Sequence, residues 1–155
     1  WKIIVFSHAP IMGSGLRVLQ NVHVVNGCAW LNHCSEDSRG RFLQIVKENP
    51  QIKAWFSGHF HLSHDFEDSI STVGSCTFVQ VGVMGPASTR DGNRQTRIVQ
   101  GCSDAFRIYT VSHHLRDQND KAQVRLDATI DITNDRVSLA HESQDFDRDD
   151  WFQAY

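Results

Sequence analysis

The sequence lacks the features that mark membrane proteins and nucleic-acid-binding proteins. No apolar run approaches the ~18 residues that a helix needs to cross a bilayer. The 15 basic residues are outnumbered by 18 acidic ones, which leaves a net charge of −3. There is therefore neither the basic surface expected for a nucleic-acid partner nor a polybasic patch for a membrane surface. We expect no nucleic-acid partner and no membrane span.

Cysteine is also sparse in a chain of 155 residues whose apolar fraction of 40% is that of an ordinary globular protein. The four cysteines are far apart and form no Cys-x-x-Cys pair; they are Cys28, Cys34, Cys76 and Cys102. Thiols placed in this way are typical of reduced cysteines, so we expect a soluble, intracellular protein. A zinc site on Cys28, His33 and Cys34 is not favoured, because no fourth ligand is in reach.

Two apolar runs, over residues 1–6 and 52–56, each lead to histidine. Such runs are typical of buried strands in α/β sheets, where ligands gather at the carboxyl ends of the strands. An extended chain alternates its side chains, so His59 and His61 should point the same way. Because imidazole is the commonest transition-metal ligand, we expect His8, His59 and His61 to form one metal site. Histidines held by hydrogen bonds alone are the alternative.

The residues between these two runs favour a helix. It is expected to run from a cap at Asp37 or Ser38 to Asn49, where Pro50 disfavours further helix. A shorter helix is expected over 16–21. Strand, helix and strand in this order form a βαβ unit, so the two histidine-ended strands should be neighbours in one sheet.

Beyond residue 75 the pattern is of strands alone. Strands are predicted over 77–83, 96–100, 105–111, 124–132 and 137–140. The last two form a hairpin around Asn134-Asp135, and 115–122 is expected to be a polar, mobile loop. The change from a βαβ unit to a strand meander predicts an α/β (α+β) protein with a second sheet.

The motifs Ser7-His8-Ala9-Pro10 and Gly58-His59-Phe60-His61 resemble the last two motifs of the calcineurin-like metallophosphoesterases. Proteins of that superfamily hydrolyse phosphate esters at a two-metal centre in an α/β/β/α sandwich. Their earlier motifs, Asp-x-His, Gly-Asp-x-x-Asp and Gly-Asn-His, occur nowhere in this sequence. The resemblance implies that 1–142 form the C-terminal half of such a domain, with the N-terminal half missing. We accordingly expect Trp1 to be the edge of a longer chain, and 143–155 to be an acidic, aromatic tail.

The resemblance also implies roles for the three histidines. His8 and His59 would bind one metal ion and His61 a second, the two being manganese, iron or zinc. No catalytic residue is expected in this chain, since the acid that protonates the leaving group would lie upstream. Three imidazoles without a carboxylate hold two dications poorly, so the segment alone is expected to be inactive.

Three other histidines are candidates for binding a phosphate-ester substrate. His23 and His33 lie in the long segment after the first strand, and His64 closely follows the Gly-His-x-His motif. The favoured alternatives are a surface or packed position for the first two and a solvated loop for His64. Two other function classes remain open. One is an inactive phosphoesterase-fold subunit of a larger assembly, and the other is a histidine-bearing structural or zinc-binding domain of another family.

Overall fold

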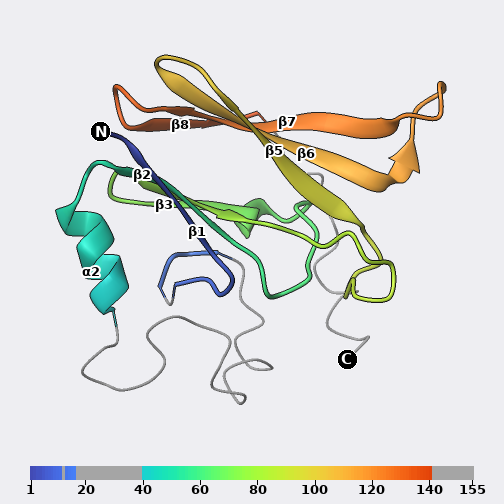
Figure 1. Ribbon diagram of the computed structural model, residues 1–155, viewed down its shortest axis with the longest axis horizontal. Helices are drawn as coiled ribbons and strands as arrows, with labels where there is room; N and C mark the ends of the chain where they lie inside the picture. The colour runs from blue at the N-terminus through green and yellow to red at the C-terminus, as the bar shows by residue number, and fades with distance from the viewer. Residues whose placement is uncertain (12, 17–39, 141–155) are drawn as a thin grey trace.

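Two four-stranded sheets form most of the part of the chain that the structure describes, which comprises residues 1–11, 13–16 and 40–140. In this computed structural model the sheets lie face to face, and helix α2 (Arg41–Glu48) lies on the side of the first sheet away from the second (Figure 1). The described residues therefore form three layers, α/β/β. This arrangement confirms the prediction of a mixed α and β protein with a second sheet.

The first sheet carries the βαβ unit. Its strands, in spatial order, are β1 (Ile3–Ser7), β2 (Ile52–Ser57), β4 (Cys76–Gln80) and β3 (Ile70–Val73). Strands β1, β2 and β4 are parallel, and β3 runs antiparallel to β4. The prediction that the two histidine-ended strands are neighbours is therefore confirmed. The sequence analysis did not predict β3, nor the short 3-10 helix η3 (Glu67–Ser69) that precedes it.

The second sheet is the predicted meander. Its strands, in order, are β5 (Gln95–Gly101), β6 (Ala105–Arg116), β7 (Ala122–Asp131) and β8 (Arg136–Leu139). All neighbouring pairs are antiparallel. Strand β6 is longer than expected, so the predicted loop begins only after Arg116. There the Asp117 carboxylate accepts hydrogen bonds from the backbone N–H groups of Asn119 and Lys121, at 2.8 and 2.9 Å, which close a turn.

Two apolar clusters hold the layers together. The cluster between the sheets joins Ala54 and Phe56 of β2 to Ile108 and Ile130 of the second sheet. The cluster under the helix includes Trp55 and the side chains Ile11, Leu16, Val46, Ile52, Cys76 and Phe78. Every residue of β2 is buried, with Phe56 and Trp55 on opposite faces, as expected of a central parallel strand. Burial of a side chain such as Phe56 stabilises the fold by about 1.5–3 kcal/mol.

Helix α2 confirms the main predicted helix. Gly40 precedes it with φ 78°, and the backbone N–H of Asn49 donates to the carbonyl of Val46 where the helix ends. The predicted caps Asp37 and Ser38 lie outside the described residues, as does most of the shorter helix expected over 16–21. No helix within the described ranges is long and apolar enough to cross a membrane.

Candidate histidine site

The carboxyl ends of β1, β2 and β4 meet at one edge of the first sheet. Ser7 pairs with Ser57 in register at the ends of β1 and β2. The ladder continues past them: Gly58 N–H donates to the carbonyl of His8 at 3.0 Å, and Val81 N–H donates to that of Ser57 at 2.7 Å. The sheet therefore brings His8 beside the Gly-His-x-His motif, as expected for ligand sites in α/β sheets.

Two of the three predicted ligands are in direct contact. His59 Nδ1 lies 2.9 Å from His8 Nε2, and the rings meet edge to face with centroids 4.9 Å apart. His61 is held separately, with its Nδ1 2.8 Å from the backbone oxygen of Ser88 in the segment after β4. Among the described residues, no group of three or more His, Cys, Asp or Glu side chains is arranged to hold a metal ion.

The backbone around the two motif histidines is not extended. Strand β2 ends at Ser57, and His59 and His61 have φ values of 76° and 57°. The two side chains therefore do not alternate along an extended strand as predicted, since the chain bends at His59 and Phe60. A left-handed residue other than glycine costs roughly 1–2 kcal/mol. Such conformations persist only where surrounding contacts hold them, and they cluster at functional sites.

The environment of His59 favours the neutral form of its imidazole. Burial lowers the pKa of its imidazole, and the charges of His8, His61 and Arg90 lower it further. Neutral imidazole is the form that binds metal ions. Arg90 belongs to the segment after β4, and its backbone N–H donates to the carbonyl of His61 at 3.1 Å.

Ser88 and Arg90 were not predicted from the sequence as parts of the site. Ser88 lies 27 residues beyond the histidine that it contacts, so no local spacing pattern relates the two. The general rule that strand ends gather at one sheet edge would have pointed to the residues following β4, once β4 had been placed beside β2.

His64 lies in the interior, with 1% of its surface exposed. The expectation of a solvated loop residue is therefore wrong. Its Nε2 accepts a hydrogen bond from Gly82 N–H at 2.7 Å, and its Nδ1 lies 2.9 Å from Thr110 Oγ1 of β6. Burial holds the pKa of His64 well below its usual value, with smaller contributions from Arg97 and Arg125. In this structure both ring nitrogens are engaged by protein groups rather than presented to a substrate.

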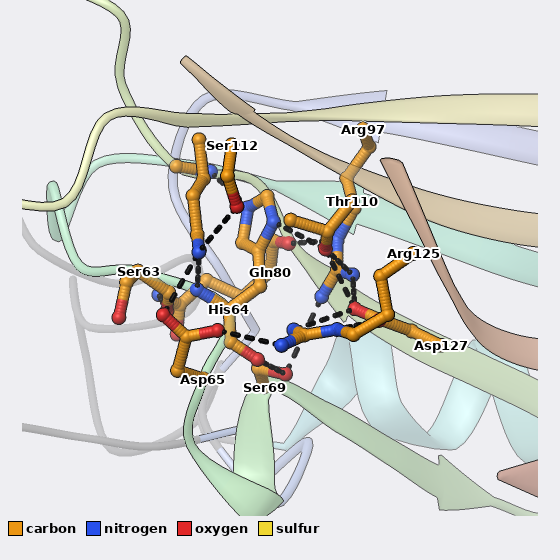
Figure 2. A network of polar contacts seen from close by, with 12 residues as sticks. Ser63, His64, Asp65, Ser69, Gln80, Arg97, Thr110, Ser112, Arg125 and Asp127 are labelled. Atoms are coloured by element: carbon orange, nitrogen blue, oxygen red, sulfur yellow. Dashed lines mark hydrogen bonds and ion pairs between the residues drawn. The ribbon is translucent and has the colours of Figure 1, made fainter. Parts of the chain in front are cut away.

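Around His64 the two sheets share a buried polar network (Figure 2). We call this set the inter-sheet network; its main members are His64, Asp65, Ser69, Gln80, Gln95, Arg97, Thr110, Ser112, Arg125 and Asp127. Asp127 pairs with Arg97 and, at 2.6 Å, with Arg125, and Arg125 also pairs with Asp65 at 2.9 Å. Two arginines thus balance two aspartates.

The ionic groups of the network respond to burial in different ways. Burial lowers the pKa of Arg97 to about 10, against the opposing effect of Asp127. Burial alone would raise the pKa of Asp127, but hydrogen bonding to Arg125 and the charge of Arg97 hold it below its usual value.

A signal for this network was present in the sequence. Polar pairs two residues apart occur on each of three neighbouring strands: Gln95 and Arg97, Thr110 and Ser112, and Arg125 and Asp127.

Most of the other candidates lie outside the described residues. These are His23, His33, Cys28, Cys34 and the predicted tail. Cys76 is a free, buried thiol whose pKa burial raises to about 12, so it is unreactive at neutral pH. Comparison of the chain with protein-family models, with curated proteins and with solved structures finds no match.

Proposed function

We propose that this chain supplies the histidine side of a two-metal phosphoesterase site. The observation that carries the proposal is the 2.9 Å separation of His8 Nε2 and His59 Nδ1 at the carboxyl ends of two parallel strands. Two nitrogens that bind one ion at ~2.1 Å, at right angles to each other, lie about 3.0 Å apart. In this structure the 2.9 Å separation is that of a hydrogen bond between the two rings, and it is also close to the separation that a shared ion with right-angle ligand geometry would impose.

His61 fits the second ligand position. A ring nitrogen that close to a backbone carbonyl must be the protonated one, so the Nδ1–H of His61 donates to Ser88 and Nε2 keeps its lone pair. Metal-binding histidines usually donate their other ring N–H to a carbonyl or a carboxylate in this way. His8, His59 and His61 thus supply imidazoles of the kind that a metal site uses. Among the described residues they do not themselves form a group arranged to hold a metal ion, so further ligands would have to complete the site.

The proposed reaction is hydrolysis of a phosphate ester. A pair of manganese, iron or zinc ions would neutralise the charge of the phosphate and activate a water molecule. The part of this chain is to hold the ions through neutral imidazoles and to place the positive charge of Arg90 near His59, where it favours an anionic substrate. A further segment, completing a four-layer α/β/β/α sandwich, would supply the carboxylates and the leaving-group acid.

The test is a calorimetric titration of the full-length natural protein with Mn²⁺ and Zn²⁺. His59→Ala should lower the metal affinity by at least the tenfold that loss of even a supporting group costs. His114→Ala serves as the matched control, because His114 lies on β6 and its Nδ1 contacts the backbone of Arg94 rather than another histidine. Equal affinities in wild type and His59→Ala would refute the assignment. Absence of binding in all three proteins would favour the inactive-subunit alternative.

A further inference from the structure

His64 lies where two functional segments meet. The first, the motif segment, is 58–65 and carries His59 and His61; the second, the crossing segment, is 81–95 and carries Ser88 and Arg90. Hydrogen bonds join the two segments at several points: Arg90 N–H to His61 O, Ser63 N–H to Asp91 Oδ2, His64 N–H to Gln95 Oε1, and Gly82 N–H to His64 Nε2. Three contacts between the segments use the side chain of a motif-segment residue: Gly82 N–H to His64 Nε2, His61 Nδ1 to Ser88 O, and Gln95 Nε2–H to Asp65 Oδ2.

The donors around His64 allow a single arrangement of protons. A backbone N–H can only donate, so Nε2 of His64 must accept from Gly82 and carry no proton. A neutral imidazole has one N–H, which therefore sits on Nδ1 and donates to Thr110 Oγ1. The Thr110 hydroxyl in turn donates to Asp127 Oδ2 at 2.6 Å. The ring is thus fixed in one tautomer by a chain of bonds that ends on a carboxylate (Figure 2).

The contact with Gly82 is sterically tight as well as polar. A Cβ atom at Gly82 would lie 2.7 Å from the carbonyl of Gln95, 3.1 Å from His64 Nε2 and 3.2 Å from the carbonyl of Leu62. No side chain fits at this position, so the backbones of the two segments approach one another directly beside the imidazole. A small change in the His64 ring would therefore move one segment relative to the other.

We propose that His64 is a positioning residue that sets the motif segment against the crossing segment. Through its bond to Gly82 it maintains the contact between His61 and Ser88 and, with it, the left-handed backbone of His59 and His61. Only the expected effect of His64 on metal binding rests on the proposed function. Its effect on the conformation of His59 and His61 can be measured without any metal.

Two substitutions distinguish the two hydrogen bonds that the His64 ring makes. In His64→Gln the longer side chain places a carbonyl oxygen near the former Nε2, so it can still accept from Gly82 but no longer reaches Thr110. In His64→Asn the shorter amide can still donate to Thr110 but does not reach Gly82. The variants differ by one methylene and both lose the imidazole, so the loss of ring packing is common to them.

The experiment uses ¹⁵N NMR of the histidine rings and backbone in the full-length natural protein, followed by titration with Mn²⁺. Wild-type His64 should show a protonated Nδ1 and an unprotonated Nε2. His64→Asn should shift the resonances of His59 and His61 and lower the Mn²⁺ affinity 10–100-fold, the usual cost of losing a supporting group. His64→Gln should leave the resonances of His59 and His61 close to their wild-type positions and should retain most of the Mn²⁺ affinity.

Two results would overturn the role of His64. One is a protonated Nε2 in the wild-type protein, a measurement that needs no variant to fold. The other is an equal disturbance of His59 and His61 in His64→Gln and His64→Asn. If the wild-type protein binds no Mn²⁺ while the resonances respond as expected, the positioning role stands and the proposed function fails.

Discussion

At the scale of single residues, the charges of the inter-sheet network depend on one another. Asp127 is the shared partner of Arg97 and Arg125, and the Arg97 side chain is 2% exposed. Removing one partner of a buried ion pair leaves the other charge uncompensated, which costs far more than the pair itself contributes. The network therefore stabilises the contact between the sheets only while it is complete.

We expect Asp127→Asn to lower the free energy of unfolding by about 3–5 kcal/mol, because it leaves Arg97 buried without a counter-charge. Urea denaturation measures this change. Asp120→Asn is the control, because Asp120 is 94% exposed and lies 4.0 Å from Arg116, a surface pair that contributes less than about 1 kcal/mol. Similar losses of stability in the two variants would show that the buried ion pairs stabilise the fold no more than a surface pair does.

The second residue-scale prediction concerns pH. Burial, then Arg97 and Arg125, hold the pKa of His64 well below 6.5 in the folded protein, whereas the unfolded chain has the ordinary value. As the pH falls below about 6.5 the unfolded chain binds a proton that the folded chain does not. The free energy of unfolding should therefore fall with decreasing pH, by at most ~1.4 kcal/mol per pH unit for this group.

Denaturation midpoints measured between about pH 7 and pH 5 test this dependence, given the ordinary histidine pKa of ~6.5. His64→Gln should make the free energy of unfolding less dependent on pH. The pH dependence that remains should include a contribution from His59, whose pKa is also lowered. An unchanged slope in His64→Gln would mean that His64 does not resist protonation in the folded state.

At the scale of elements, the end of β4 is limited by space. Gly82→Ala would put Cβ 2.7 Å from the backbone oxygen of Gln95, which cannot move without displacing β5. Overpacking of this kind costs about 1–3 kcal/mol. Gly101→Ala on β5 is the control, since its Cβ would meet only Phe106 at an ordinary 3.7 Å. Thermal unfolding of both variants should show a clear loss of stability for Gly82→Ala alone. Equal stability of the two variants would show that the motif segment and the crossing segment can move apart without cost.

The elements also show what the sequence could predict. Strand β2 and helix α2 were predictable because a long apolar run and a 3.6-residue stripe are strong local signals. Strand β3 was not, because Ile70–Val73 is short and is defined by its pairing with β4. The turn at His59 and His61 escaped prediction for a related reason. Both residues have a left-handed backbone, and His61 contacts Ser88 in the segment after β4, a distant contact that no local pattern reveals.

At the scale of the whole molecule, the first sheet has an apolar edge. Strand β1 is at the end of the strand order in the described sheet, and Phe6 is 72% exposed although its ring stacks on Phe56 at 5.1 Å. The sequence predicted the histidine-ended strands β1 and β2, but not how their histidine side chains are oriented. The carboxylates proposed to complete the site would come from a further segment near the carboxyl ends of these two strands.

This proposal leads to an expectation for the chain of residues 1–155 by itself. The three candidate ligands are imidazoles, and in the described part of the chain they do not form a group arranged to hold a metal ion. Neutral imidazoles carry no negative charge, so the repulsion between two dications would be uncompensated. We expect the isolated chain to show no Mn²⁺-dependent hydrolysis of p-nitrophenyl phosphate, whereas the full-length natural protein should hydrolyse it. His59→Ala in the full-length protein is the control that ties the activity to this site. Metal-dependent hydrolysis by the isolated chain that is lost in His59→Ala would contradict the expectation, and would mean that residues outside the described ranges complete the site from within this sequence.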